Sequence, residues 1–173
     1  MHCSLIAAIS ADGFIARTAL ERSFDWTSEA DKAFYVSQIK SADAIIMSLK
    51  TFSTFSRYPK GSRWILYTNQ PENFVNPAPG VISAEATKET PLAVMARLEQ
   101  EGVQKIMVAG GSSVYTQFLQ AGVVDTVYLT LEPVFFGTGV GLFNQSLGTT
   151  LVSLVKTTQL SEQTLLLEYA VVK

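Results

Sequence analysis

The residues best suited to chemistry in this chain form a turn of glycine and serine. Gly110 and Gly111 follow the apolar run 106–109. Ser112 and Ser113 come next, where an amphipathic helical pattern begins. Glycine lets the main chain approach a ligand closely, and the first turn of a helix offers free N–H groups and the positive end of its dipole. The turn is therefore suited to the phosphate of a nucleotide. The alternative is a tight turn in which Ser112 only caps the helix.

Polar groups follow two other apolar runs in the same way. Lys50 and Thr51 come after the run 44–48 and would place a cation and a hydroxyl at a helix start. Thr68 and Asn69 follow the next run, where a ribose or its phosphate would fit. Ligands of parallel α/β sheets bind beyond the carboxyl ends of the strands, so three such turns together favour a dinucleotide. Each turn alone could be an ordinary helix cap beside a solvated lysine, and the G-x-G-x-x-G pattern is absent.

A carboxylate and an aromatic ring lie one helical turn apart near the N-terminus. Asp31 falls in the first turn of a helix predicted over 28–40, and Tyr35 follows on the same face. Together they would line one wall of a substrate pocket, where burial would raise the pKa of Asp31 and suit it to a nitrogen heterocycle. Trp26 is a further substrate-binding candidate. The alternative is that Asp31 serves only a Ser28-x-x-Asp31 helix cap and that Trp26 belongs to the core.

Length and composition indicate one globular domain over residues 1–173, with 47% hydrophobic and 16% charged residues. No apolar stretch approaches the roughly 20 residues of a membrane helix. The apolar run 5–9 is too short for a signal peptide and lacks a basic flank. We therefore expect a cytoplasmic protein that does not associate with a membrane.

Charge and residue counts exclude several kinds of chemistry. The net charge is −2 without a basic stripe, so nucleic acid is not an expected partner. Cys3 is the single cysteine and His2 the single histidine. These counts leave no internal disulfide, thiolate cluster, histidine-based zinc site or Ser-His pair. We expect no metal, and a reaction that runs without these groups.

Strand and helix patterns alternate along most of the chain. Strands are predicted at 4–9, 44–48, 63–68, 81–83, 105–109 and 126–131, and a helix is predicted from Thr90-Pro91 to Gly102. This alternation predicts an α/β fold with a mostly parallel central sheet and right-handed crossovers. Runs at 151–158 and 163–172 predict an antiparallel hairpin that closes the sheet.

The motifs above, in order and spacing, resemble those of dihydrofolate reductase. The matching segments are Asp12-x-x-Ile15, Trp26 with Asp31, Met47 before Lys50-Thr51, 106–111 with Val114-Tyr115, and 128–130. The segments 10–16, 41–47 and 132–143 are more similar to a sister group, and this resemblance covers nearly the whole chain. That group is the reductase domain of the riboflavin-biosynthesis deaminase-reductase, with its stand-alone relatives. The resemblance implies a dihydrofolate reductase-like three-layer α/β/α fold.

The resemblance also implies NADPH as hydride donor and a pyrimidine or pteridine substrate. It puts Ala8 and Ile15 beside the nicotinamide, Gly110 and Gly111 under the pyrophosphate, Lys50 and Thr51 on the phosphates, and Thr68 and Asn69 near the ribose 2′-phosphate, with Ser112 and Ser113 completing the cofactor set. Asp31 would bind the heterocycle and assist its protonation, with Thr130 in the same hydrogen-bond network. The implied chemistry is direct hydride transfer in a water-poor pocket.

One departure concerns the choice of cofactor. Ser48 and Leu49 stand where the resembling enzymes usually have glycine and arginine. A preference for NADPH over NADH then needs a positive charge from Arg57, Lys60 or Arg63.

We expect an NADPH-dependent reductase of the riboflavin-biosynthesis type, acting on 5-amino-6-(5-phosphoribosylamino)uracil or a similar compound. The second possibility is a dihydrofolate reductase. The third belongs to another class, a nucleotide-binding protein without turnover in which the loop 17–25 senses the ligand. The apolar C-terminal strands and Phe135-Phe136 predict a surface that a second copy would cover, giving a homodimer.

Overall fold

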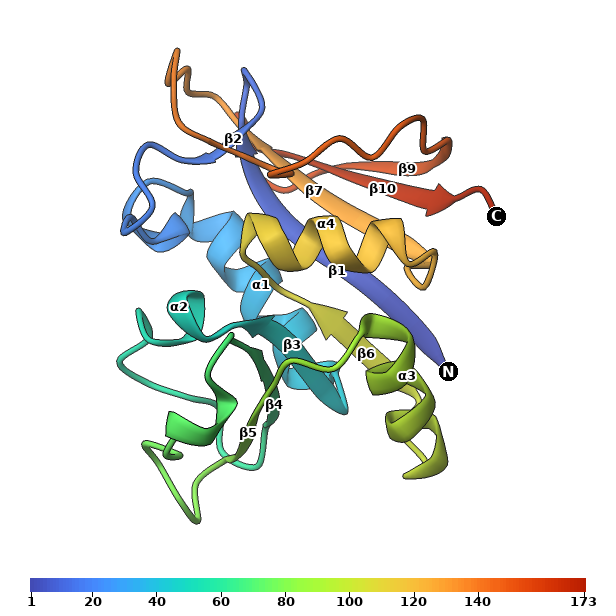
Figure 1. The fold of residues 1–173 in the computed structure, drawn as a ribbon. Helices are drawn as coiled ribbons and strands as arrows, with labels where there is room; N and C mark the ends of the chain where they lie inside the picture. The colour runs from blue at the N-terminus through green and yellow to red at the C-terminus, as the bar shows by residue number, and fades with distance from the viewer.

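The computed structural model describes residues 1–173, and its centre is one eight-stranded sheet (Figure 1). Across the sheet the order is β5 (Ser83–Thr87), β4 (Arg63–Tyr67), β3 (Ala44–Ser48), β6 (Lys105–Val108), β1 (His2–Ser10), β7 (Thr126–Glu132), β10 (Leu165–Val171) and β9 (Val152–Gln159). Neighbours from β5 to β7 are parallel, and β10 is antiparallel to both β7 and β9. The predicted parallel sheet with its closing hairpin is confirmed.

Helices cover both faces of this sheet. The helices α3 (Pro91–Gln100) and α4 (Ser112–Gln120) pack on one face, and α1 (Glu29–Ser41) and α2 (Leu49–Phe52) pack on the other. Each face has its own apolar core, and alternate side chains of one strand enter opposite cores, as Ile45 and Ile46 of β3 do. The predicted three-layer α/β/α fold is confirmed. Two 3-10 turns, at Ser23–Asp25 and Pro71–Asn73, lie in connecting loops.

The predicted helix starts and stops are confirmed by their hydrogen bonds. Ser28 is the N-cap of α1, where its hydroxyl accepts the N–H of Asp31 at 3.2 Å. Thr90 caps α3 in the same way, and Pro91 takes the first helical position. Gly102 follows α3 with φ of 84°, a conformation that glycine adopts without strain.

One predicted strand is wrong in its bounds. The expected run 81–83 is not a strand. The strand β5 instead covers Ser83–Thr87 and lies at the edge of the sheet, where only β4 pairs with it. Pairing with β4, from Arg63 opposite Ser83 to Tyr67 opposite Thr87, defines this edge strand. Because an edge strand is only partly covered, its sequence lacks the apolar run that marks a buried strand.

A second, two-stranded sheet has no counterpart in the sequence-based prediction. It consists of β2 (Phe14–Ala16) paired antiparallel with β8 (Val140–Gly141), and we call it the flap. Both strands are too short to produce a periodic pattern. None of the helices in the fold combines the length and apolar character needed to cross a membrane.

Candidate functional site

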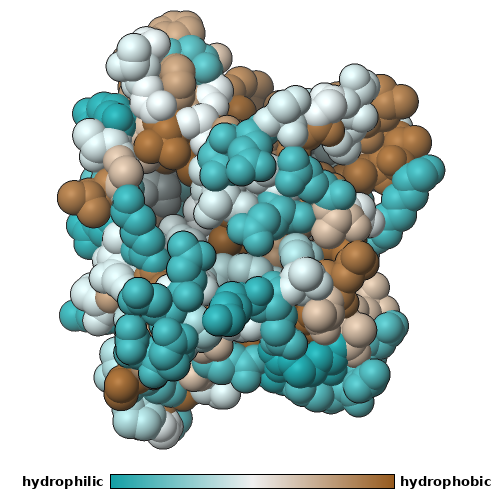
Figure 2. All heavy atoms as spheres, viewed as in Figure 1, coloured by the Kyte–Doolittle hydropathy of each residue, from teal (hydrophilic) through white to brown (hydrophobic).

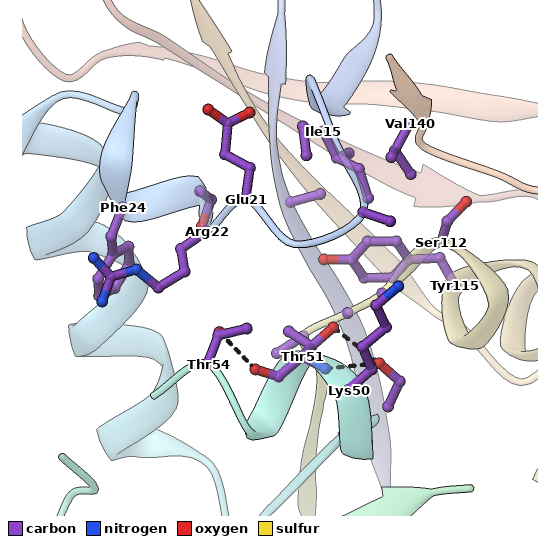
Figure 3. A pocket seen from close by; sticks show the side chains of 18 of the residues that line it. Ile15, Glu21, Arg22, Phe24, Lys50, Thr51, Thr54, Ser112, Tyr115 and Val140 are labelled. Atoms are coloured by element: carbon purple, nitrogen blue, oxygen red, sulfur yellow. Dashed lines mark hydrogen bonds between the residues drawn. The ribbon is translucent and has the colours of Figure 1, made fainter. Parts of the chain in front are cut away.

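A cavity of about 550 Å³ opens beside β1, at the carboxyl ends of β3 and β6. Figure 3 shows its walls: Lys50 and Thr51 come from α2, Ser112 and Tyr115 from α4, and Ile15 and Val140 from the flap. The loop 17–25 closes the remaining side with Arg22 and Phe24. This is the edge of a parallel sheet at which ligands are expected.

The glycine turn forms one end of the cavity. Gly110 has φ of 125°, outside the range that other residues tolerate, and its peptide bond to Gly111 is cis. A Cβ on Gly111 would lie 3.1 Å from Thr51 Oγ1, so a larger residue would fill the cradle between the two turns. The N-terminus of α4 points into this cradle, where its dipole favours an anion.

Hydrogen bonds hold this turn against the turn that carries Lys50. The Ser48 hydroxyl accepts the N–H of Thr51 at 3.1 Å and lies 2.9 Å from its hydroxyl. The Ser48 N–H donates to the carbonyl of Gly110 at 2.7 Å. Lys50 has no carboxylate partner, and its ammonium points toward the side of the cavity where Ser112 lies (Figure 3). A free cation, two hydroxyls and a helix N-terminus therefore face one space.

Ser112 does not cap α4, so the capping interpretation of this residue is wrong. The N-cap is Gly111, without a side-chain hydrogen bond. The Ser112 hydroxyl instead donates to the carbonyl of Gly141 at 2.8 Å, which ties the helix to the flap.

Asp31 is buried, with 4% of its surface exposed. Burial raises the pKa of its carboxyl. The Thr130 and Thr27 hydroxyls lower this pKa in part, and the Glu132 charge raises it further. Neither threonine oxygen has a hydrogen bond of normal geometry, and both are shielded from solvent. Buried polar groups usually have partners, so this cluster has the capacity to bind a polar ligand or water.

The capping interpretation of Asp31 holds only for its main chain. Its N–H donates to Ser28, and its carboxyl takes no part in that cap. Tyr35 follows Asp31 by one turn on the same face of α1. Burial raises the pKa of the Tyr35 and Tyr115 phenols, and the Asp31 charge adds to this, after the effect of Tyr35 in the case of Tyr115. Both tyrosines line the cavity. Asp31 therefore sits directly behind the cavity wall.

The cavity brings together more than half of the predicted site residues. Those lining it are Ile15, Tyr35, Lys50, Thr51, Gly110, Gly111, Ser112 and Ser113. Those outside its lining are Ala8, Trp26, Asp31, Thr68, Asn69 and Thr130. Ala7 lines it in place of its neighbour Ala8. Trp26 packs edge-on against Phe136, with ring centroids 5.0 Å apart, and its buried indole N–H has no partner.

Several lining residues were not assigned a site role from the sequence. The Tyr115 hydroxyl donates to the carbonyl of Ile6 at 2.6 Å, which fixes its ring at the cavity wall. Arg57 lines the cavity and has no carboxylate partner, whereas Arg63 pairs with Glu101 at 2.5 Å and does not line it. Arg57 was one of three arginines and lysines named for a missing charge, and spacing could not choose among them.

The cavity continues past an aromatic group toward a second, smaller one of about 320 Å³. Phe24, Tyr35, Phe55 and Arg57 line both. The ring of Phe24 meets those of Tyr35 and Phe55 edge-on, at 5.5 and 6.2 Å. A ligand that enters from the glycine turn would therefore reach an aromatic wall with one free guanidinium beside it.

Comparisons with known proteins show which sequences and folds this chain resembles. In sequence, the chain is 26% identical over 166 residues to YwjB of Bacillus subtilis (strain 168), an uncharacterized protein, and the match covers 91% of each. In structure, it is similar to a putative riboflavin biosynthesis protein from Shewanella sp. PV-4, with a TM-score of 0.80, 17% identity and full coverage of both chains.

Two further solved structures share the fold. The deaminase/reductase of Thermotoga maritima, named for 5-amino-6-(5-phosphoribosylamino)uracil, matches with a TM-score of 0.75 and 15% identity, over 99% of this chain and 56% of that one. The dihydrofolate reductase of Enterococcus faecalis, complexed with NADP(H), matches with a TM-score of 0.71 and 16% identity. This match covers 99% of this chain and 97% of that one. The sequence also matches the RibD C-terminal domain over residues 2–166. Since this match spans nearly all of the sheet and the whole cavity, the chain belongs to the RibD C-terminal domain family.

Proposed function

We propose that this protein is an NADPH-dependent reductase of the riboflavin-biosynthesis type. It would reduce the ribose-derived imine of 5-amino-6-(5-phosphoribosylamino)uracil, or of a similar aminopyrimidine, to the ribitylamino product. One observation carries the proposal: a single cavity runs from the glycine turn to the wall in front of the buried Asp31. Family membership supports the reductase class.

The residues at the glycine turn fit a dinucleotide. The space above Gly110 and Gly111 would be filled by any Cβ, and main-chain N–H groups of α4 with the Lys50 ammonium face the same space. In this proposal Thr51, Ser112 and Ser113 complete the phosphate site, and Ile15 flanks the nicotinamide with Ala7, which lines the cavity in place of Ala8. Thr68 and Asn69, outside the lining, would approach the ribose 2′-phosphate only where the cofactor extends beyond the cavity. NADPH, when bound, supplies the hydride. The chain orients it and, through the flap, limits access of water.

The opposite end of the cavity would hold the substrate. Burial raises the pKa of Asp31, which suits its carboxyl to share a proton with a ring nitrogen or with the reacting imine. Thr130 would complete its hydrogen bonds, while Tyr35 shapes the pocket and Trp26 lies outside its lining, packed on Phe136. Arg57 would bind the anionic end of the substrate, because its guanidinium is free and lines this end.

The test is a direct assay of cofactor and substrate. We expect NADPH fluorescence to change on binding, and NADPH to be oxidised when the aminopyrimidine ribosylphosphate is added. Dihydrofolate is the comparison substrate, since it too ends in an anion that Arg57 could bind. Oxidation with dihydrofolate alone would make the protein a dihydrofolate reductase, and binding of NADPH without oxidation by either substrate would favour a nucleotide-binding protein.

We also propose that the protein is a homodimer joined through β9. This strand has one free edge, and its apolar side chains are exposed on both faces, including Leu154 at 56% and Val155 at 60%. Figure 2 shows apolar residues gathered over the corresponding part of the surface, at the upper right. An exposed apolar edge strand favours pairing with another chain.

A further inference from the structure

A second buried carboxylate lies near Asp31 and has no role in the proposal above. Glu132 is the last residue of β7, with 3% of its surface exposed, and it forms no salt bridge. Its carboxylate accepts hydrogen bonds from the Ser28 N–H at 2.9 Å, the Ser28 hydroxyl at 2.8 Å and the Thr164 hydroxyl at 3.2 Å. In each of these contacts a carboxylate oxygen of Glu132 is the acceptor, although the single Thr164 proton can go instead to the Ser28 hydroxyl, 3.1 Å away.

These contacts replace a familiar pattern at the start of α1. In a capping box, the acid three residues after the N-cap accepts the N–H of the N-cap residue. Asp31 holds that position relative to Ser28. Here Glu132, from a strand of the central sheet, takes the Ser28 N–H instead. The Asp31 carboxyl is thereby left for Thr27 and Thr130.

No cation lies close enough to Asp31 and Glu132 to neutralise the charge of Glu132. The groups that act on Asp31 are Glu132 from β7, Lys32 from its own helix, and the two threonine hydroxyls. Tyr35 and Tyr115, which also adjoin it, are kept neutral because burial raises the pKa of each. Lys32 pairs with Glu29 at 2.7 Å on the outer surface, where the Glu29 side chain is 90% exposed. No cation is buried with the two acids.

We propose that Glu132 is a positioning residue for the reaction, which caps α1 in place of Asp31 and places a second buried carboxylate close to the Asp31 carboxyl, where its charge adds to the effect of burial. The proposal rests on the function inferred above, in which Asp31 is the acid. It explains why a buried acid without a cation stands at this position. Like charges that share a low-dielectric site disfavour the ionisation of one of them.

The decisive variant is Glu132→Gln, which keeps an oxygen for Ser28 and removes the charge. The carboxyl resonance of Asp31, followed by carbon NMR in ligand-free protein and assigned with Asp31→Asn, reports the titration directly. We expect its midpoint to move to lower pH by on the order of one unit, as for the loss of a nearby like charge. The pH profile of kcat should move in the same direction, with the KM for NADPH unchanged.

Two controls separate charge from structure. Glu29→Gln removes an exposed charge from the same helical turn and should leave the midpoint in place. Glu132→Asp keeps the charge and shortens the side chain, so it should retain the midpoint while lowering kcat; a midpoint that falls equally in both variants would assign the shift to structure and overturn the proposal. An unmoved midpoint in Glu132→Gln, with only a lower Tm, would overturn the proposal.

The NMR titration needs neither cofactor nor substrate. A shifted midpoint in a protein that oxidises no NADPH would therefore uphold the coupling of the two acids and reject the reductase function alone.

Discussion

Asp31 has two separable uses, one for its main chain and one for its side chain. The main-chain N–H completes the cap with Ser28, while the carboxyl lies buried behind the cavity wall. Because the two uses involve different atoms, a substitution can remove one and keep the other. The same separation lets a helix terminus place an acid accurately, since the cap that fixes the helix start also fixes the side chain three residues later.

The variant Asp31→Asn is expected to lose reductase activity and keep its fold. Loss of a proton donor should lower kcat by about 10²- to 10⁴-fold. Burial raises the folded-state pKa of Asp31 above its ordinary value of 3.8, so folded protein holds this proton more tightly than unfolded protein. Stability of the wild type should then fall relative to Asp31→Asn as pH rises from 3.8 through the raised pKa. Activity assays and Tm against pH measure both effects. Unchanged turnover would show that Asp31 has no role in the reaction and serves only in the cap of α1.

Lys50 is expected to contribute to dinucleotide affinity through its charge. Lys50→Ala should weaken NADPH binding by roughly 10- to 100-fold, the value of about 1.5–3 kcal/mol for a hydrogen bond to a charged group. Lys60→Ala is the matched control, because Lys60 is exposed and does not line the cavity. Fluorescence titration of NADPH measures both. Equal affinities for the two variants would remove Lys50 from the site.

Local spacing could predict some site residues and had no means to predict others. Gly110 and Lys50 follow strands directly, so a pattern of apolar runs is enough to bring them to one edge of the sheet. Glu132 depends on a contact with Ser28, 104 residues away, that no local pattern records. Tyr115 could have been assigned from its place one turn into α4, since the helix start was recognised.

The flap is the element that covers the site, and contacts at both ends hold it. Asp12, just before β2, accepts the N–H groups of Phe136 and Gly137 at 3.1 and 2.6 Å. At the other end, Ser112 holds the carbonyl of Gly141. The loop 17–25 follows β2 directly, so its position over the cavity depends on the flap.

Gly139 should be required for the flap to close. A Cβ at this position would overlap the Ala16 carbonyl oxygen, which is main chain and cannot rotate away. Gly139→Ala should therefore separate β2 from β8 and speed tryptic cleavage after Arg17 or Arg22 by about tenfold, for a loss of about 1.4 kcal/mol in local stability. Global Tm should change little, since neither buried core cluster includes a residue of β2 or β8 and only Ile15 of these strands packs against one. Time courses of proteolysis test this, with Thr138→Ala as control, and equal cleavage rates would contradict it.

Element prediction succeeded where burial imposes a pattern. The parallel strands β1, β3 and β6 are covered on both faces and read as continuous apolar runs. It failed for β5, whose strand character comes from pairing with β4, and for the flap, whose strands have three and two residues. In both cases the partner strand, and not the local sequence, defines the element.

At the scale of the whole molecule, the edge strand β9 has both unpaired main-chain groups and exposed apolar side chains. Its apolar side chains are exposed to solvent in a single copy of the chain. One row of its main-chain N–H and C=O groups has no partner strand. A second copy that covers this strand would satisfy both.

Leu154→Lys should convert the expected dimer to a monomer. Light scattering after size exclusion should give twice the chain mass of 18.8 kDa for the wild type and the single chain mass for the variant. Leu92→Lys is the control, because Leu92 is as exposed, at 62%, but lies in α3, away from the sheet edge. A wild-type protein that elutes with the mass of one chain would end the dimer proposal.

The hydrogen bond from Ser112 to Gly141 uses the only proton of the Ser112 hydroxyl, which a phosphate in the proposed site would also need. A hydroxyl has a single proton to give, so an incoming phosphate that takes it must release the Gly141 carbonyl, at a cost of about 1 kcal/mol. Binding of a phosphate at the glycine turn would then destabilise the closed flap, and a more stable flap would lower the affinity for the phosphate by the same factor. In the proposed site, Ser112 would thus couple the affinity for the cofactor to the position of the flap.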